Sequence, residues 1–322
     1  MTRPLRAGLA AVLFTPLFAM AAAGAVEVQA HRGGRALMPE NTLAAFAHAM
    51  DLKVDTLELD TVLTRDDAVV VMHDPRLNPN LVRDAAGRWI DAPGPAVRSL
   101  TLAELQRFDT GRLRPGTRYA SQYPDQQPVD GERIPTLAQL FTLVQKRGDA
   151  RVRFNIETKS TPLEPELAPE PEAFVKALLA VIDAHGMRER VTLQSFDWRT
   201  LMVAQRLAPA LPTVCLTARQ SWLDNVADAR WTAGLVLADH GGSVPRLVKA
   251  AGCAVWSPYF GDLDAASLAE AHTLGLRVVA WTVNDEAAIA RLLELGVDGL
   301  ISDRPDRVQA ALAARAKPAA AR

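Results

Sequence analysis

Three carboxylates in two apolar stretches of this chain are spaced so that they could hold a metal ion. Glu58 and Asp60 lie two residues apart in 55-DTLELDTV-62, and Glu157 lies in 151-RVRFNIETK-159. Residues two apart on a strand point to the same face, where bare like charges would repel one another. Acidic side chains without a zinc-type cysteine or histidine spacing favour Ca²⁺ or Mg²⁺, so we predict one such cation here. The alternative for the first stretch is an edge strand with a solvated acidic face.

Two histidines and two cationic side chains lie at the ends of neighbouring apolar runs. His31 and Arg32 follow one run directly, His73 follows another, and Lys159 lies two residues beyond the third carboxylate. A metal ion beside Arg32 and Lys159 would form an anion site, and phosphate is the anion that fits it. Two histidines beside such a site suit a base and an acid at near-neutral pH. The alternatives are structural histidines and a Lys159 that only neutralises the neighbouring carboxylate.

Later strand ends offer further side chains that could contact a substrate. Gln194, Trp281 and Asn284 each lie at or just beyond the end of an apolar run. We predict that they bind substrate at the same site, with core packing as the alternative for Trp281. The remaining histidines lie on predicted helices or loops, where we expect them to be structural or solvated: His48, His185, His240 and His272.

Apolar runs alternate with amphipathic stretches along most of the chain, which is the pattern of parallel βα units. The strand candidates are nine, at 26–30, 55–62, 151–157, 191–195, 213–216, 234–238, 254–258, 277–283 and 297–301. We expect helices after Thr42, before His185, and at 101–109, 136–147, 198–207, 222–229, 265–274 and 286–295. The run 234–238 is the weakest, and we assign it to a loop, which leaves an α/β fold of the (β/α)8 TIM-barrel type. A doubly wound open sheet is the alternative, but no glycine-rich nucleotide-binding loop follows any strand.

The segment from about 78 to 135 interrupts this alternation. Its periodicity is weak, and proline, glycine, arginine and aspartate are frequent in it. A loop of this length is usually functional. Active groups of a barrel gather at the carboxyl ends of its strands. We therefore predict a small inserted subdomain after the second strand, beside the site.

The first 25 residues have the pattern of a secretory signal peptide. Arg3 and Arg6 precede an uncharged apolar run at 7–22, and Ala-Gly-Ala at 23–25 offers a cleavage site. We expect cleavage there and a single domain over 26–315, located in the periplasm or secreted. An uncleaved membrane anchor is the alternative, because the apolar run is close to spanning length.

The remaining composition is that of an ordinary globular protein. Hydrophobic residues make up 49% of the chain and charged residues 23%, and the formal net charge is −1. Near-neutral charge argues against nonspecific binding to nucleic acid or to anionic membranes, so we expect a small-molecule partner and no stable membrane association. Cys215 and Cys253 match no zinc spacing, and they could either pair or remain as two buried thiols.

These motifs resemble those of the glycerophosphodiester phosphodiesterase family. The matching segments occur in the family's order and span nearly all of the chain after the leader: HRGGRALMPENT, ELD, HD, NIETK, QSF, AWTVN and GVDGLISDRPD. The resemblance implies a TIM barrel with an inserted subdomain. It also implies a Ca²⁺ or Mg²⁺ ion held by Glu58, Asp60 and Glu157, an acid–base pair of His31 and His73, and phosphate contacts from Arg32 and Lys159.

The reaction implied by the resemblance is hydrolysis of a glycerophosphodiester to sn-glycerol 3-phosphate and an alcohol. In the family's usual scheme, a glycerol hydroxyl attacks phosphorus to give a cyclic phosphate, which water then opens. We take His31 as the base and His73 as the acid. The stretch 77-LNPNLVRDAAG-87 departs from the leucine and R-T-T-like segment that many members carry there. This departure alters the rim of the site, where substrate preference is decided.

Two other functions compete with this one. A phospholipase D-like or phosphatidylinositol-cleaving barrel would act on intact lipids and would need an apolar rim. The predicted insertion is too polar for such a rim, with Arg112, Arg114, Arg118, Asp125 and Asp130 along it. A periplasmic protein that only binds phosphodiesters would need the cationic side chains but would have no use for two histidines beside a metal.

Overall fold

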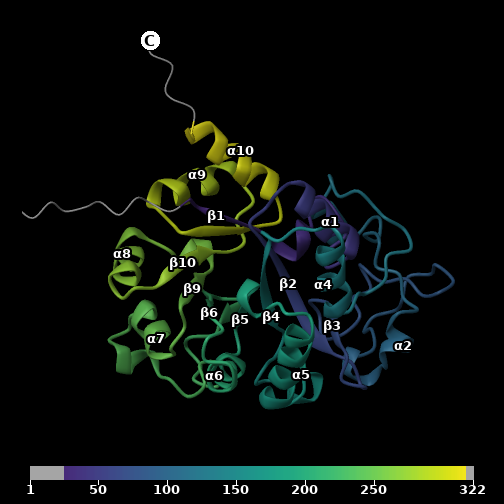
Figure 1. Ribbon diagram of the computed structural model, residues 1–322, viewed down its shortest axis with the longest axis horizontal. Helices are drawn as coiled ribbons and strands as arrows, with labels where there is room; N and C mark the ends of the chain where they lie inside the picture. The colour runs from purple at the N-terminus through teal and green to yellow at the C-terminus, as the bar shows by residue number, and fades with distance from the viewer. Residues whose placement is uncertain (1–24, 317–322) are drawn as a thin grey trace, which may run out of the picture.

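Eight parallel strands form a closed barrel in a computed structural model that describes residues 25–316 (Figure 1). Around the barrel the order is β1, β2, β4, β5, β6, β9, β10 and β11, and β11 pairs back with β1. The strands span Glu27–Ala30, Thr56–Leu63, Arg153–Thr158, Val191–Ser195, Thr213–Thr217, Val255–Pro258, Arg277–Ala280 and Gly299–Ser302 in that order. The predicted (β/α)8 TIM barrel is therefore confirmed.

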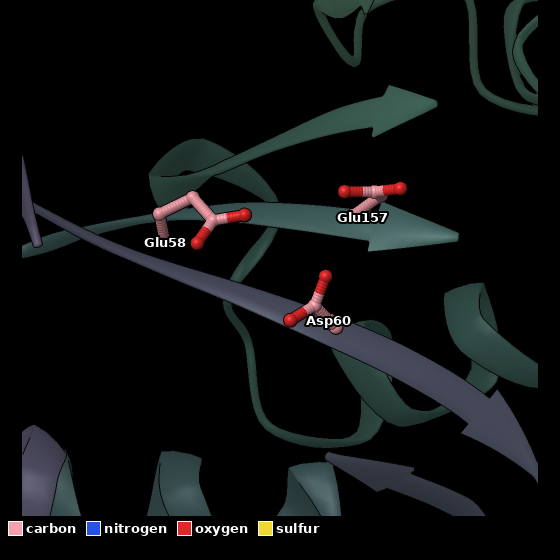
Figure 2. A group of neighbouring side chains, drawn as sticks. All are labelled: Glu58, Asp60 and Glu157. Carbon is pink, nitrogen blue, oxygen red and sulfur yellow. The ribbon is translucent and has the colours of Figure 1, made fainter. Parts of the chain in front are cut away.

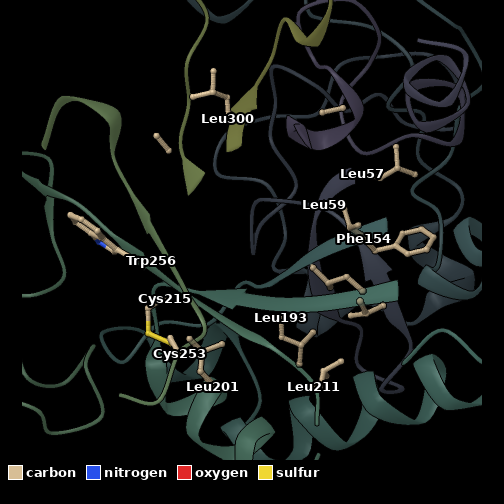
Figure 3. Packing of buried hydrophobic residues seen from close by; sticks show 14 of the residues in the cluster. Leu57, Leu59, Phe154, Leu193, Leu201, Leu211, Cys215, Cys253, Trp256 and Leu300 are labelled. Carbon is tan, nitrogen blue, oxygen red and sulfur yellow. A yellow bond between two sulfur atoms is a disulfide. The ribbon is translucent and has the colours of Figure 1, made fainter. Parts of the chain in front are cut away.

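Helices surround the barrel, and the main core lies between helices and strands (Figures 1 and 3). Leu57 and Leu59 of β2 belong to this outer core. Because side chains alternate along a strand, Glu58 and Asp60 point to the opposite face, into the barrel. The covering helices are α1 (Leu43–Asp51), α4 (Leu137–Lys146), α5 (Pro171–Ala184), α6 (Trp198–Leu207), α7 (Val244–Ala250), α8 (Ala265–Thr273), α9 (Glu286–Leu295) and α10 (Pro305–Ala316).

The segment between β3 (Val69–Val71) and α4 has an apolar cluster of its own. β3 pairs antiparallel with the end of β2, and the segment carries two short helices, α2 (Leu102–Leu105) and α3 (Arg118–Gln122). Its cluster joins side chains of β2 and β3 to side chains of the segment: Val62, Val70, Met72, Leu77, Val82, Val97, Leu105 and Ile134. The helix expected at 101–109 is only the single turn of α2. A capping box between Thr101 and Glu104 stabilises its N-terminus.

The helix predicted at 222–229 is wrong. Leu223–Asp224 (β8) instead pairs antiparallel with Arg219–Gln220 (β7) in a short hairpin. The next residue, Asn225, accepts a hydrogen bond from the backbone of Ala218 at 2.9 Å and donates to the carbonyl of Leu216 at 3.0 Å. These side-chain contacts hold the backbone in a turn, where asparagine competes well with helix formation.

Two further stretches lie between this hairpin and β9. The interpretation of 234–238 as a loop is confirmed, because Leu237–His240 forms only a 3-10 turn there. Helix α7 was not expected from the sequence. Its pattern is nevertheless a regular helix start, with a Ser243 cap that accepts from the backbone of Arg246, followed by a proline in the first turn.

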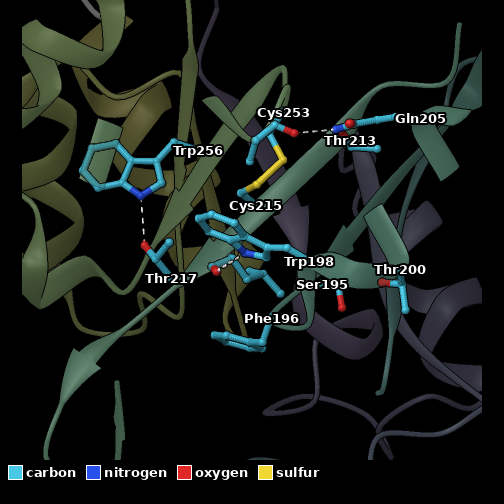
Figure 4. The surroundings of a disulfide bond; sticks show 12 residues. Ser195, Phe196, Trp198, Thr200, Gln205, Thr213, Cys215, Thr217, Cys253 and Trp256 are labelled. Carbon is cyan, nitrogen blue, oxygen red and sulfur yellow. Dashed lines mark hydrogen bonds between the residues drawn. A yellow bond between two sulfur atoms is a disulfide. The ribbon is translucent and has the colours of Figure 1, made fainter. Parts of the chain in front are cut away.

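The two cysteines form a disulfide between β6 and the residues before β9 (Figures 3 and 4). Cys215 and Cys253 are separated by 38 residues and are both buried. Of the two alternatives left open by the sequence, pairing is the one that the structure shows. Closing a loop of this length stabilises a fold by about 4 kcal/mol in the chain-entropy account.

The signal peptide predicted at 1–25 lies, except for its last residue, outside the described residues. Within residues 25–316, no helix combines the length and the apolar character needed to cross a membrane.

Candidate active site

Three carboxylates converge inside the barrel between β2 and β4 (Figure 2). Asp60 lies opposite Glu157 in the register of the two strands, and Glu58 lies two residues earlier on β2. One oxygen atom from each side chain lies within 4.8 Å of the others. All three residues are buried, with relative exposures of 1%, 0% and 6% for Glu58, Asp60 and Glu157. The structure therefore brings together the acids that were predicted to bind a metal.

Burial opposes ionisation of these acids, and positive neighbours decide which of them stays charged. Removal from water raises the pKa of Glu58 well above its usual range, and the charges of Asp60 and Glu157 raise it further. Burial also raises the pKa of Glu157, to about 7, although Lys159 acts against this rise. Burial disfavours the charged form of Asp60 too, but His73 and nearby cationic side chains hold its pKa below the usual range. A divalent cation would replace the protons on such a cluster.

Hydrogen bonds hold the carboxylates in place and leave one oxygen available. The backbone N–H of Arg32 and the amide of Gln194 donate to the two oxygens of Glu58, at 2.9 and 2.6 Å. The amide of Asn41 donates to Oδ2 of Asp60 at 2.9 Å. Oδ1 of Asp60 is buried and has no hydrogen-bond partner among residues 25–316. A set of oxygen ligands with an unpartnered buried oxygen fits a hard divalent cation such as Ca²⁺ or Mg²⁺.

His31 lies on a single 3-10 turn directly after β1 and is held by a buried aspartate. Its Nδ1 lies 2.5 Å from Oδ1 of Asp303, which follows the last strand. Asp303 is only 1% exposed, and it also accepts hydrogen bonds from Nε of Arg35 and Nδ2 of Asn284, both at 2.7 Å. A proton on Nδ1 that is donated to Asp303 leaves the lone pair of Nε2 available for a substrate proton.

His73 follows β3 and has a carboxylate partner of its own. Its Nδ1 lies 2.6 Å from Oδ1 of Asp74, whose other oxygen accepts from the amide of Asn78 at 2.8 Å. Burial and nearby positive charges lower the pKa of His73 well below its usual range. Burial also lowers the pKa of His31, although Asp303 acts in the opposite direction. Burial therefore favours the neutral form of both rings before substrate binds.

A cavity of about 130 Å³ brings these groups together. It is lined by both histidines, two of the carboxylates and three cationic side chains, together with polar and apolar residues: His31, Arg32, Arg35, Glu58, His73, Glu157, Lys159, Gln194, Phe196, Leu216, Trp281, Thr282 and Ile301. Arg35 and Phe196 were not predicted. Their positions offered a signal, since Arg35 follows the two glycines after Arg32, and Phe196 directly follows the strand that ends at Ser195.

The segment between β3 and α4, which is the predicted insertion, contacts the cationic side of this cavity through α3. The hydroxyl of Tyr119 donates to Oε2 of Glu40 and accepts from Nη1 of Arg35, the latter at 3.3 Å. Oε1 of Glu40 in turn accepts from Nη1 of Arg32 at 2.7 Å. The guanidinium of Arg35 also lies over the ring of Tyr123, 5.1 Å from its centroid. The insertion thus fixes the two arginines from the outside.

Two of the residues predicted to bind substrate are occupied by protein contacts. Gln194 lines the cavity, but its amide is shared between Glu58 and Asn155, which donates to it at 2.8 Å. Asn284 is absent from the cavity lining, and its amide holds Asp303 instead. Direct contact of these two residues with substrate stays a prediction. What the structure shows is that Gln194 donates to Glu58 and that Asn284 donates to Asp303.

The turn that presents His31 depends on Gly33, and we expect Gly33→Ala to lower the free energy of unfolding by about 2–3 kcal/mol. Gly33 has a φ of +79°, and an added Cβ would lie 2.9 Å from Cβ of Ala45. Gly275 has a similar φ of +74° with nothing within 4 Å, so Gly275→Ala should lose only about 1 kcal/mol. Urea unfolding of both variants measures the difference, and equal losses would contradict the close contact at Gly33.

Comparisons with known proteins agree on one family. A family model described as the Glycerophosphoryl diester phosphodiesterase family matches residues 31–307. A glycerophosphodiester phosphodiesterase of Caldanaerobacter subterraneus is 31% identical over 281 residues, covering 87% of this chain and 94% of its own length. A crystal structure of a putative glycerophosphoryl diester phosphodiesterase from Silicibacter pomeroyi is 36% identical, with a TM-score of 0.82, covering 90% of this chain and 94% of that one. An Oleispira antarctica phosphodiesterase in complex with the product sn-glycerol-3-phosphate has a TM-score of 0.65 and 22% identity, covering 89% and 96%.

Proposed function

The chain belongs to the glycerophosphoryl diester phosphodiesterase family, and we propose that it hydrolyses glycerophosphodiesters to sn-glycerol 3-phosphate and an alcohol, using one divalent cation and two histidines. The observation that carries this proposal is the single cavity lined by two histidines, two of the three clustered carboxylates, and Arg32, Arg35 and Lys159. The product bound to the Oleispira antarctica protein agrees with the proposed product.

Glu58, Asp60 and Glu157 would hold the cation. Bound there, a Ca²⁺ or Mg²⁺ ion would polarise the phosphoryl group and offset its negative charge. Lys159 lies 2.7 Å from Glu157 and 3.8 Å from Asp60 in the structure, so its ammonium lies beside two of the three carboxylates. Together with Arg32, which is held by Glu40, it would bind the phosphate oxygens.

The two histidines would move protons in opposite directions. Nε2 of His31 takes the proton of a glycerol hydroxyl, whose oxygen attacks phosphorus, and His73 gives a proton to the departing alcohol oxygen. The buried carboxylate of Asp303 stabilises the imidazolium that forms on His31, which supports His31 as the base. The negative charge of a bound diester acts against the lowering of the His73 pKa by burial and favours the protonated form that an acid needs.

Water completes the reaction. The first step leaves a cyclic phosphate, a proton on His31 and none on Nε2 of His73. His73 then takes a proton from water, whose oxygen attacks phosphorus, and His31 returns its proton to the glycerol oxygen as the ring opens. The second step gives sn-glycerol 3-phosphate and returns both histidines to the protonation states that they had with the diester bound.

The product assay tests the proposed function. Purified protein is supplied with glycerophosphocholine, glycerophosphoethanolamine or glycerophosphoglycerol and with Ca²⁺ or Mg²⁺, and sn-glycerol 3-phosphate is measured enzymatically. We expect release of sn-glycerol 3-phosphate together with the free alcohol. Binding of a diester without release of sn-glycerol 3-phosphate under any of these conditions would show a binding protein instead.

Small diesters are favoured over intact lipids by the cavity itself. A volume of about 130 Å³ is well below the range of about 300–1,000 Å³ for sites that enclose larger ligands. Its cationic side is closed by the polar insertion, through Tyr119 and Arg35. An enzyme acting on phosphatidylinositol or another intact lipid would need an apolar surface at that place.

We also propose that the protein is exported and acts in the periplasm or outside the cell. The proposal is supported by the leader pattern of residues 1–25 and by the disulfide between Cys215 and Cys253, since disulfides persist in oxidising compartments. Sequencing of the mature amino terminus from fractionated cells should give a start near Val26 in the periplasmic fraction. A start at Met1 in the cytoplasmic fraction would contradict export.

Metal affinity should depend on pH, because protons and the cation compete for the same carboxylates. Burial raises the pKa of Glu157 to about 7 and that of Glu58 well above its usual range, so the metal-free cluster carries protons at neutral pH. Affinity for Ca²⁺ should therefore rise with pH, by about tenfold per unit for each displaced proton. Calorimetric titrations in buffers of different ionisation enthalpy count these protons, and an affinity that is constant between about pH 5.5 and 8 would contradict the prediction.

A further inference from the structure

Three aromatic rings form a corner beside the cavity. Trp281 lines the cavity itself, and its ring centroid lies 5.6 Å from that of Tyr259 and 6.2 Å from that of Trp222. Trp222 and Tyr259 are 5.5 Å apart. The three ring planes meet at 65°, 80° and 85°, so they stand nearly perpendicular to one another, as three walls of a box do.

The protein holds each of these rings in place. The indole N–H of Trp281 donates to the carbonyl of Ser257 at 3.0 Å, and the backbone of Tyr259 pairs with that of Trp281 beyond the ends of β9 and β10. Trp222 lies in the turn of the β7–β8 hairpin. That hairpin is fastened by Asp262, whose carboxylate accepts from the backbone N–H of Arg219 at 2.8 Å and from the side chain of Gln220.

Trp222 is exposed in a way that packing does not explain. Its relative exposure is 59%, and it belongs to none of the apolar clusters of the core. Its ring contacts those of Tyr259 and Trp281 instead, and Trp281 lines the cavity.

Charge distinguishes the corner from the cavity beside it. The cavity carries Arg32, Arg35 and Lys159, whereas the three rings carry no charge. Around the hairpin, Arg219 lies 3.8 Å from Asp224, and Arg291 donates to the carbonyls of Phe260 and Leu263, on either side of Asp262. A ligand that is anionic in the cavity and presents an ammonium group to the ring faces fits both.

We propose that this aromatic corner is a subsite for the alcohol moiety of the substrate and that it selects a quaternary ammonium group, as in glycerophosphocholine. The inference rests on the proposed function, because it takes the phosphodiester to be bound in the neighbouring cavity. Faces of tryptophan and tyrosine attract methylated ammonium groups, and such groups are commonly bound by several rings at large mutual angles. A neutral alcohol would gain no cation–π attraction from the three rings.

Kinetics of Trp222 variants on two diesters test the proposal. Trp222→Ala should raise KM for glycerophosphocholine by about fivefold to thirtyfold with little change in kcat, which is the range of a cation–π contact. It should leave KM for glycerophosphoglycerol unchanged. Trp222→Phe keeps a ring and should restore most of the affinity for glycerophosphocholine. Leu163→Ala removes another exposed apolar side chain, 50% exposed, and should alter neither substrate.

The outcomes separate this inference from the proposed function. Equal changes in KM for both diesters, or no change for glycerophosphocholine, would overturn the ammonium subsite while the enzyme remained active. If wild-type protein hydrolysed no diester, the proposed function would fail by itself. Binding of glycerophosphocholine to His31→Ala, compared calorimetrically with the double variant that also carries Trp222→Ala, would then still decide the subsite. A tighter complex with the tryptophan present supports it, and equal affinities contradict it.

Discussion

Replacement of His31 or of His73 by alanine is expected to lower kcat for glycerophosphodiester hydrolysis by about a hundredfold to ten-thousandfold each. Both rings line the cavity, and each has its Nδ1 held by a carboxylate, at 2.5 Å from Asp303 and at 2.6 Å from Asp74. Each variant loses a proton-transfer group but none of the three clustered carboxylates. Steady-state kinetics on purified variants, with the cation saturating, measure the loss.

A matched control is available at the surface. His272 pairs with Asp298 at 2.9 Å and its side chain is 41% exposed, so it is a histidine–aspartate pair outside the cavity. His272→Ala should leave kcat unchanged. If either His31→Ala or His73→Ala retained wild-type kcat under the same conditions, that histidine would not be an acid or a base of the reaction.

Asp303→Asn should lower kcat by about a hundredfold or more while KM and metal affinity stay close to wild type. Three donors face the carboxylate of Asp303, from His31, Arg35 and Asn284. An asparagine must turn its NH₂ group toward one of them. If it faces His31, the ring keeps its proton on Nε2 and cannot accept one from the substrate. If it faces away, the negative charge that stabilises the imidazolium is still lost.

Asp197 provides the control for loss of a buried acid. It is fully buried, caps α6 and pairs with Arg199 at 2.6 Å, and it does not line the cavity. Asp197→Asn is expected to change stability and to leave kcat as it is. A fall in kcat for Asp303→Asn that matches a loss of secondary structure by circular dichroism would mean that Asp303 serves the fold and does not orient His31.

Much of the site could be predicted because its signals are local. Glu58 and Asp60 stand out as two acids at a spacing of two within an apolar strand, and His31, Arg32 and Lys159 lie at strand ends. In a closed parallel barrel the carboxyl ends of all strands meet on one side, so residues far apart in sequence become neighbours. The structure confirms that convergence, with Asp60 opposite Glu157 in the strand register.

The parts that could not be predicted depend on contacts between distant segments. Asp303 precedes α10, and only the closure of β11 onto β1 brings it to His31. Tyr119 reaches Arg35 from a stretch without regular periodicity. The expected helix at 222–229 failed for a local reason, since the side chain of Asn225 holds the backbone in a turn. The pairing of Cys215 with Cys253 likewise follows from the adjacency of β6 and β9.

The measurement that tests the central claim most directly is a metal titration of chelator-stripped enzyme, followed both by heat and by release of sn-glycerol 3-phosphate. We predict that activity is absent without metal and returns in proportion to occupancy of one site per chain by Ca²⁺ or Mg²⁺. Glu157→Gln, which alters one of the three clustered carboxylates, should weaken binding and activity to the same extent. Full turnover by stripped enzyme, or wild-type metal binding by Glu157→Gln, would contradict a metal-dependent site between β2 and β4.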